Sequence, residues 1–451
     1  PIDKVGIMCY NGGAKRKTQG KAPADAPTTP TRRAERDTAQ RNNGMENAKN
    51  IRHVYADNAA TTAMSTAALE KMIWALENQY GNPSSLHTVG QEAKVYLEDA
   101  RARVAKCLGA ADPREILFTS GGSESDNTAV RSAAYNGARK GRKHLISTAF
   151  EHHAILHTLD ALKKEGFEVT LLPVSPDGFV TAEQVRDAIR PDTALVSVMY
   201  ANNEIGTVQP IREIGAVCRA AGVVFHTDAV QAVGHIPVDV QADNVDMLSL
   251  SAHKFHGPKG TGVLYVRRGI PLQPLIRGGA QERNLRAGTE NLPSILAMTA
   301  ALEEAVSRLP DRMARLAHMR DRLIDGILAI PHTVLNGTVL RDAAHRLPGT
   351  VNVCVEGIEG ESLLLRLDLA GICASSGSAC TSGSLEPSHV LLAIGRPAEI
   401  AHGSLRLSLS ETNTEEDVDY ILEKLPGIIA TLRDMSPVWE DLETGRLAHR
   451  I

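Results

Sequence analysis

Lys254 lies between two histidines in the stretch His253-Lys-Phe-His256, after the apolar run 245–250 and before Gly257-Pro258. A strand that ends in small, polar and Gly/Pro residues places its last side chains at a sheet edge, where α/β folds bind ligands. A partly desolvated lysine at such an edge can form a Schiff base with a carbonyl cofactor. In isolation, this short motif is more often a surface lysine in a tight turn.

The segment Thr119-Ser-Gly-Gly-Ser-Glu124 is a candidate anion site between a predicted strand and a predicted helix. Glycines let the backbone approach an anion, and the N–H groups that begin the helix, together with a hydroxyl, can hold a phosphate. The segment is neither Gly-x-Gly-x-x-Gly nor a Walker P-loop, which disfavours a nucleotide and favours a single phosphate. The alternative is an ordinary turn between a strand and a helix.

The apolar stretch 223–226 is followed by two polar residues, Thr227 and Asp228, so Asp228 lies at the end of the predicted strand. An acid at the carboxyl end of a strand can keep a pyridinium nitrogen protonated and so make a ring an electron sink. In isolation, an aspartate at this position is as often the N-cap of a helix. Gln231 follows closely enough to donate to a ring hydroxyl, and the short separation between Asp228 and Lys254 permits adjacent strands.

His152, in Glu151-His-His153, follows another predicted strand. Its imidazole can stack on an aromatic cofactor and move protons near neutral pH. A histidine pair also raises the question of a metal, but no third ligand accompanies it at a sensible spacing. Asn203, in the polar turn 202–206, is placed by the same logic at the presumed ligand edge, although Asn-rich turns are common.

Cys380 lies in the Gly/Ser-rich stretch 375–384, and Arg406 lies in the predicted strand 404–408. Loops of small residues are exposed and mobile, so the thiol is predicted to be accessible and able to attack a substrate and carry a product away. Arg406 alternates with apolar neighbours, and its planar fork suits either a substrate carboxylate or a structural ion pair. The segment 283–289 is basic and contains Thr289, which makes it a candidate to complete the phosphate site.

The composition is that of an ordinary soluble globular protein. Of the 451 residues, 43% are hydrophobic and 23% are charged, and the net charge of −4 argues against a nucleic-acid-binding surface. No apolar run approaches the roughly 18 residues that span a bilayer. The six cysteines contain no CxxC pair, which favours free thiols in a reducing compartment.

Strand and helix patterns alternate through the first two thirds of the chain. Apolar stretches at 116–118, 144–146, 167–172, 193–199, 223–226, 245–250 and 262–266 read as strands. This alternation predicts an α/β fold with a mostly parallel sheet covered on both faces. Long helices at 292–309 and 311–328 lead into a smaller α+β unit, which a helix at 414–435 closes. Residues 1–50 are Pro-rich and poor in large apolar residues, and we expect them to be disordered.

Several of these motifs, in this order, resemble the NifS/IscS-type cysteine desulfurases, which are class V pyridoxal-phosphate enzymes of the aspartate-aminotransferase fold. The resemblance covers about residues 53 to 440. It is carried by Asp57-Asn-Ala-Ala-Thr-Thr62, Gly81-Asn-Pro83, Phe118-Thr-Ser-Gly-Gly-Ser-Glu-Ser-Asp-Asn127, Asn202-Asn-Glu-Ile-Gly206, His226-Thr-Asp-Ala-Val-Gln231, His253-Lys-Phe-His-Gly-Pro-Lys259 and Ser376-Gly-Ser-Ala-Cys-Thr381.

The resemblance implies a site for pyridoxal 5′-phosphate. Lys254 would bind the cofactor covalently, with His152 stacked on the ring and active in proton transfer. The other implied cofactor residues are Gly122, Ser123, Asn203, Asp228, Gln231, Ser251 and His253, with Thr289 from the second subunit of a homodimer. Asn82 and Arg406 would bind the carboxylate of L-cysteine. Cys380 would take the sulfur as a persulfide and is a candidate transient iron–sulfur ligand.

The resemblance also implies a division of the chain and a set of partners. A segment at 51–65 would pack on the small domain, a large domain at 66–305 with a seven-stranded sheet would bind the cofactor, and a small domain at 306–451 would carry the Cys380 loop. The loop matches the long-loop group, which implies sulfur delivery to a U-type iron–sulfur scaffold protein and a cytoplasmic location. The alternatives are a selenocysteine lyase, another class V enzyme, or a sulfur carrier without catalysis.

Overall fold

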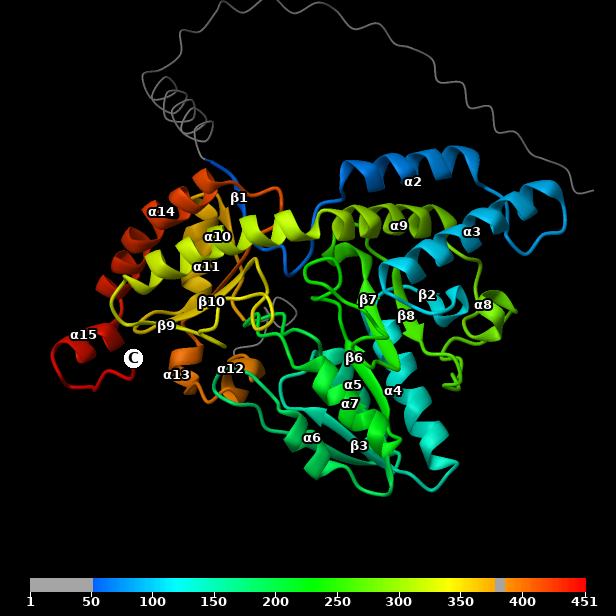
Figure 1. The fold of residues 1–451 in the computed structure, drawn as a ribbon. Helices are drawn as coiled ribbons and strands as arrows, with labels where there is room; N and C mark the ends of the chain where they lie inside the picture. The colour runs from blue at the N-terminus through cyan, green and yellow to red at the C-terminus, as the bar shows by residue number, and fades with distance from the viewer. Residues whose placement is uncertain (1–51, 378–385) are drawn as a thin grey trace, which may run out of the picture. The chain divides into compact units, whose positions relative to one another are not determined.

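A seven-stranded sheet is the main structural unit of the protein, for which a computed structural model describes residues 52–377 and 386–451. The strand order is β2-β8-β7-β6-β5-β3-β4, and only β8 is antiparallel to its neighbours. The strands are β2 (Ile116–Thr119), β3 (His144–Thr148), β4 (Glu168–Leu172), β5 (Thr193–Ser197), β6 (Val224–Asp228), β7 (Met247–Ser251) and β8 (Gly262–Val266). The predicted mostly parallel α/β sheet is therefore confirmed (Figure 1).

Helices cover both faces of this sheet. On one face lie α4 (Gly122–Ala138) and α5 (His153–Lys164), which pack on Leu117, Leu195 and their neighbours. On the other face lie α3 (Thr88–Cys107), α7 (Ile211–Ala221) and α9 (Leu292–Ser307), and they pack on Phe118 and Val196. Because successive side chains of a strand point to opposite faces, strands covered on both sides read as continuous apolar runs. The remaining helices of this part are α2 (Thr66–Asn78), which packs along α9, and α6 (Ala182–Ala188), η1 (Pro113–Glu115), η2 (Ala252–Lys254) and α8 (Gln281–Asn284).

A second, antiparallel sheet has its own core. Its order is β12-β10-β9, formed by β12 (Ser404–Ser408), β10 (Thr350–Val355) and β9 (Thr333–Leu335). It is covered by α10 (Leu309–Leu328), α11 (Gly360–Leu369) and α14 (Glu415–Asp434), and β1 (Val54–Tyr55) pairs nearby with β11 (Ile372–Cys373). The helices α9 and α10 follow one another along the top of Figure 1 and connect the two sheets. Short helices α12 (His389–Ala393), α13 (Ala398–Ala401) and α15 (Pro437–Glu443) complete the described chain.

Helix ends follow the side chains that cap them. Thr414 and Asp417 form a capping box at the start of α14, and Gly109 has a left-handed φ of +69° just after α3. The helix α5 begins at His153. His152 ends the turn before it, because its Nδ1 accepts a hydrogen bond from the N–H of Ala154 and caps α5.

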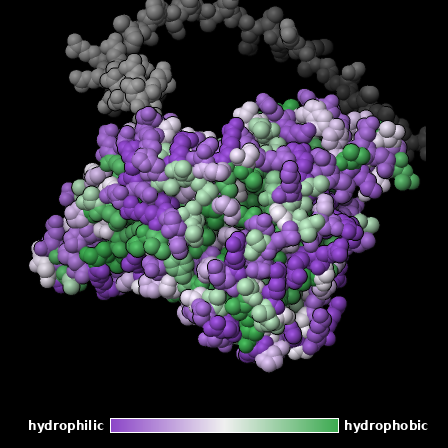
Figure 2. Space-filling model, viewed as in Figure 1, coloured by the Kyte–Doolittle hydropathy of each residue, from purple (hydrophilic) through white to green (hydrophobic). Residues whose placement is uncertain are grey.

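The surface shown in Figure 2 is mostly hydrophilic, with apolar side chains gathered around β9 at the left of the view. Among the helices that the structure describes, none combines the length and the apolar character that crossing a membrane requires.

A buried ion pair between α3 and α8 gives a test of the packing. The Arg101 guanidinium, 2% exposed, donates to both carboxylate oxygens of Glu282 at 2.8 and 2.6 Å. We expect Arg101→Leu to lower the free energy of unfolding by about 3–5 kcal/mol, because it leaves a buried carboxylate without its countercharge. Adding Glu282→Gln should recover part of that loss, as measured by urea unfolding.

The matched control is the partly exposed pair of Arg103 and Glu303, which joins α3 to α9. Arg103→Leu should cost at most about 1 kcal/mol, since exposed ion pairs are screened by solvent. Equal losses at the two arginines would contradict the role assigned to burial.

Candidate active site

A cavity of about 300 Å³ opens at the carboxyl ends of β6 and β7. Its walls come from both sheets and from the segment that precedes α2. The predicted site residues that line it are Gly122, Ser123, His152, Asn203, Asp228, Gln231, Ser251, His253, Lys254 and Arg406. Predicted site residues from six separate stretches of the sequence therefore meet in one cavity.

The amine of Lys254 is held by main-chain oxygens from a distant segment. Lys254 ends the turn η2, which directly follows β7, and its Nζ donates to the oxygens of Ala59 at 2.6 Å and Ala60 at 2.8 Å. The N–H of Ala59 donates in turn to Ser408 Oγ on β12, at 2.8 Å. The segment of residues 57–62 thus fixes the direction of the lysine side chain.

Asp228 lies next to this turn because β6 and β7 are adjacent parallel strands, with Asp228 opposite Ser249. Its side chain is 5% exposed, and its Oδ1 accepts a hydrogen bond from the N–H of Val230 at 3.0 Å. Burial raises the pKa of Asp228 above its usual value, and the neighbouring His152 and Lys254 offset only part of this effect. The adjacency that the sequence separation permitted is confirmed, and the acid begins no helix.

His152 contributes an imidazole of defined tautomer. Its Nδ1 accepts from the N–H of Ala154 at 3.1 Å, so in the neutral ring the proton is on Nε2. Gln231 is buried and donates from Nε2 to the oxygen of Ala59 at 2.9 Å. These two contacts orient both side chains before any ligand binds.

Two further buried acids near the cavity, Asp126 and Glu151, were not among the predicted site residues. Burial raises the pKa of Asp126 well above its usual value, with the negative charge of Asp228 adding to the effect. Burial likewise raises the pKa of Glu151 to about 8. Asp126 lines the cavity, and its Oδ1 has no hydrogen-bond partner among the described residues. Both are part of motifs read from the sequence, but nothing in residue type distinguishes a buried acid from an exposed one.

His226, behind this cluster, is neutral. Its Nδ1 and Nε2 contact the hydroxyls of Ser197 and Ser249 at 2.9 and 3.0 Å, and burial lowers its pKa to about 3. The neutral imidazole therefore forms no ion pair with Asp126, although its Nε2 lies 3.7 Å from Asp126 Oδ1.

The start of α4 forms an anion-binding corner of the cavity. Gly121 has a φ of +149°, and a Cβ at Gly122 would meet Val230 Cγ2 at 2.7 Å, so glycine lets the backbone lie close to the turn that follows β6. The first N–H groups of the helix have no partner within the helix. Ser123 and Ser251 add hydroxyls. His253 is neutral, because burial and the nearby Lys254 lower its pKa to about 4.

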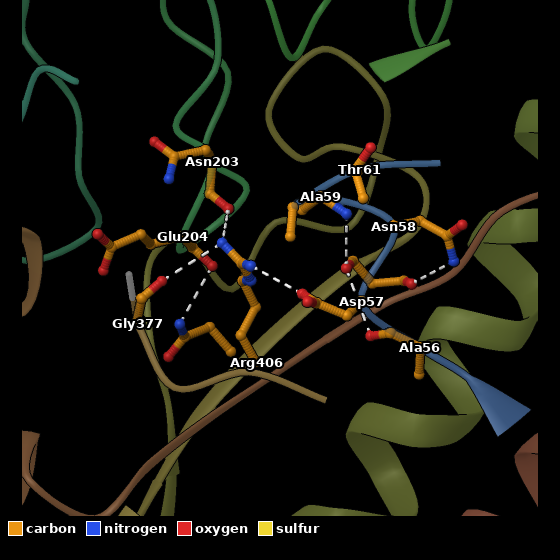
Figure 3. Close-up of polar contacts among 12 residues, drawn as sticks. Ala56, Asp57, Asn58, Ala59, Thr61, Asn203, Glu204, Gly377 and Arg406 are labelled. Carbon is orange, nitrogen blue, oxygen red and sulfur yellow. Dashed lines mark hydrogen bonds and ion pairs between the residues drawn. The ribbon is translucent and has the colours of Figure 1, made fainter. Parts of the chain in front are cut away.

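Arg406 closes the cavity from the second sheet (Figure 3). Its Nη1 donates to the main-chain oxygens of Asn203 at 3.1 Å and Gly377 at 3.3 Å, and its Nη2 donates to Asp57 at 2.9 Å. The side chain is 2% exposed, and its Nε has no partner among the described residues. Arg406 is thus both an ion-paired structural residue and a donor at the cavity wall.

Two predicted site residues among the described ones, Asn82 and Thr289, do not line this cavity. Asn82 is exposed, and its Oδ1 accepts from the N–H of Ser84 at 2.9 Å. Thr289 is also exposed. Cys380 lies outside the described residues, whereas its flanks reach the cavity region. Gly377 contacts Arg406 as above, and His389 Nε2 contacts the main-chain oxygen of Glu151 at 3.0 Å.

Glu151 gives a pH-dependent test of the buried acids. In the unfolded chain its pKa is near 4.5, and in the folded protein it is about 8. An acid with a raised folded pKa binds its proton more tightly when folded, so stability is lost as the pH rises from about 4.5 to 8. Glu151→Gln removes this loss, and its gain in free energy of unfolding should grow across that window. Unfolding in urea at several pH values measures it, and a gain that stays constant with pH would contradict the assignment.

Comparisons with known proteins agree with this geometry. The family model of aminotransferase class V matches residues 54–421. The chain is 54% identical over 391 residues to "Cysteine desulfurase IscS" of Clostridium botulinum, covering 86% of this chain and 98% of that protein. It is 48% identical over 387 residues to "Cysteine desulfurase NifS" of Azotobacter vinelandii, covering 86% and 95%.

Solved structures lead to the same family. A structure titled "NIFS-LIKE PROTEIN" superposes with a TM-score of 0.78 at 39% identity, covering 84% of this chain and all of that one. The predicted resemblance is thus confirmed on the level of both sequence and fold. This chain belongs to the aminotransferase class-V family, in the branch of the NifS/IscS-type proteins.

Proposed function

We propose that this protein is a cysteine desulfurase, which converts L-cysteine to L-alanine and leaves the sulfur as a persulfide on Cys380. One observation carries the proposal. A lysine, a buried acid and an arginine line one cavity, and that arginine contacts Gly377, three positions before Cys380. The relatives that carry the name cysteine desulfurase support it at 54% and 48% identity.

The cavity suits pyridoxal 5′-phosphate by the chemistry of its donors. The unpaired N–H groups at the start of α4, with the Ser123 and Ser251 hydroxyls, match a phosphate. Asp228 matches a pyridine nitrogen, and the Lys254 amine matches an aldehyde. A Cβ at position 122 would fill the cradle, which is why the close backbone approach needs glycine there. When bound, the cofactor supplies an electron sink for charge released at the substrate Cα.

The protein's own residues would position and protonate the reactants. Asp228 would contact the ring nitrogen of the bound cofactor, and the neighbouring Lys254 favours the charged form of this acid against the effect of burial. His152 and Lys254 are the groups that move protons, with the Nε2–H of His152 set by the contact of its Nδ1. Asn203 and Gln231 would contact the ring oxygen or its surroundings, and His253 would join the phosphate contacts.

Arg406 would bind the substrate carboxylate. Its Nε is buried at the cavity wall without a partner among the described residues, and a carboxylate would satisfy it. The hydrogen bond from Nη2 to Asp57 fixes the orientation of the Arg406 guanidinium. Asn82 remains a proposed second contact to the same carboxylate, and its exposure means that another chain or a rearranged loop would bring it there.

The short chain separation between Gly377 and Cys380 supports transfer of the substrate sulfur to the Cys380 thiol. Three residues span at most about 11 Å, so Cys380 is tied within that distance of Gly377. A Cys380 thiolate attacks the sulfur of bound cysteine, an S–S bond forms as the C–S bond breaks, and the carbon takes a proton to become alanine. Substrate cysteine and one thiol thus give alanine and one persulfide, with no external oxidant.

A homodimer and a sulfur acceptor complete the proposal. Thr289 is exposed, as is a row of apolar side chains on α2 that includes Leu69, Ile73 and Leu76, which suits contact with a second copy. We propose residues 66–305 as the cofactor-binding domain and residues 306–451 as the domain that carries Cys380. The acceptor that best suits the Ser-Gly-Ser-Ala-Cys sequence is a U-type iron–sulfur scaffold protein.

Mutation of Cys380 tests the proposal. Cys380→Ala should abolish the release of alanine from L-cysteine, because no thiol then accepts the sulfur, while the cofactor absorbance stays. Cys373→Ser, a partly exposed cysteine in β11, is the matched control and should keep normal turnover. Lys254→Ala should remove the absorbance of the lysine-bound cofactor.

The same assay separates the alternative activity. If Cys380→Ala retains alanine release from cysteine, the desulfurase mechanism is wrong. Strong turnover of selenocysteine with little turnover of cysteine in the unmodified protein would indicate a selenocysteine lyase instead.

A further inference from the structure

A second group of ligand-type side chains lies far from the cavity, in the part of the chain that the structure describes. His332, Glu356 and His449 each offer one atom, and these atoms all lie within 4.8 Å of one another. His332 precedes β9, Glu356 follows β10, and His449 belongs to the segment after α15. None of them takes part in the proposed desulfurase chemistry.

The two imidazoles converge on one carboxylate oxygen. Nδ1 of His449 lies 2.8 Å and Nδ1 of His332 lies 3.4 Å from Oε2 of Glu356. The rings stack with centroids 3.8 Å apart and planes 20° apart. The Glu356 side chain is 4% exposed, and its Oε1 accepts from the N–H of Arg450 at 2.7 Å. The buried carboxylate is thus held in place from its other oxygen.

A main-chain oxygen adds a fourth donor, since Nδ1 of His332 lies 3.1 Å from the oxygen of Ile451. In a tetrahedral zinc site with bonds of about 2.0–2.1 Å, donor atoms lie about 3.3 Å apart. The separations of 2.8, 3.1 and 3.4 Å bracket that value. His332 also has a left-handed φ of +56°, a conformation that non-glycine residues adopt at a cost.

We propose that His332, Glu356 and His449, together with the oxygen of Ile451, bind a Zn²⁺ ion. Two imidazole nitrogens and a carboxylate are donors that zinc favours. Binding moves the imidazole protons to Nε2, so that each Nδ1 lone pair faces the ion, and no electron transfer is involved. The ion would fasten residues 449–451 to the edge of the second sheet.

Two neighbouring side chains bear on the proposed zinc site: Arg433 lowers its affinity for the cation, and Trp439 can report binding by fluorescence. The Arg433 guanidinium donates to the main-chain oxygens of Glu356 and Pro331 and lies 4.0 Å above the Trp439 ring, so one fixed positive charge is nearby. That charge weakens the binding of a cation. The Trp439 ring lies 5.4 Å from His332 and 5.7 Å from His449, so its fluorescence should respond to an ion between them.

The test is a zinc titration of untagged, chelator-washed, cofactor-loaded protein. Cys380→Ala removes the thiol that competes for zinc, and Trp74→Phe leaves Trp439 as the one tryptophan, since the chain has two. We expect one Zn²⁺ per chain by calorimetry, with a saturable change in Trp439 emission. His449→Gln should weaken binding about tenfold or more, as loss of a ligand costs at least what loss of its supporting contacts does. His332→Asn should do the same, and asparagine tolerates the left-handed backbone.

The matched control is His345→Gln. His345 is a partly exposed histidine of the same half of the protein, paired with Asp342 and outside the group. It should leave zinc binding unchanged. The proposal is overturned if no saturable binding occurs, or if His449→Gln binds zinc as tightly as its parent. It is also overturned if zinc acts only on the cofactor absorbance, which would place the ion in the cavity at Asp126, His152 and Asp228.

Discussion

The pairing of β6 with β7 is the constraint on which the cavity depends. Two adjacent parallel strands end at one sheet edge, so the acid that ends β6 and the lysine that follows β7 face the same space. Burial at that edge makes each charge costly and raises the pKa of Asp126, Glu151 and Asp228. Asp228 and Lys254 both line the cavity, and the lysine lowers the pKa of this acid against the effect of burial. Such a pair suits a ligand that carries both a pyridine nitrogen and an aldehyde.

The second sheet makes this cavity a site for a particular substrate. Arg406 extends from β12 into the cavity, and one guanidinium joins Asp57, Asn203 and Gly377. Asp57 belongs to the segment 57–62, which holds Lys254, and Gly377 lies three residues before Cys380. A single buried side chain therefore links the proposed cofactor site, substrate site and sulfur-accepting thiol, which explains why an arginine with a rigid fork suits this position better than a lysine.

The sequence predicted the parts of the site that residue type and order determine. The α/β alternation, the strand end at Asp228, the turn that carries Lys254 and the glycines at the start of α4 all lie where the pattern placed them. It could not predict that the main-chain oxygens of Ala59 and Ala60 accept hydrogen bonds from the lysine amine, because every residue type has such an oxygen. Nor could it separate Asp126 from an exposed acid, since burial is a property of tertiary packing. The start of α5 could not be predicted either, because the capping role of His152 depends on its rotamer. The roles assigned to the site residues, including Asn82, Thr289 and Cys380, remain predictions.

The central claim is that the sulfur of free cysteine becomes bonded to one particular thiol of this chain. Its most direct measurement is mass spectrometry of the protein after a brief reaction with L-cysteine labelled in its sulfur, followed by alkylation and peptide mapping. We predict one labelled sulfur atom on the peptide that contains Cys380, in amounts that match the alanine released. Labelled sulfur on Cys373 or another cysteine, or alanine release with no protein-bound sulfur, would contradict it.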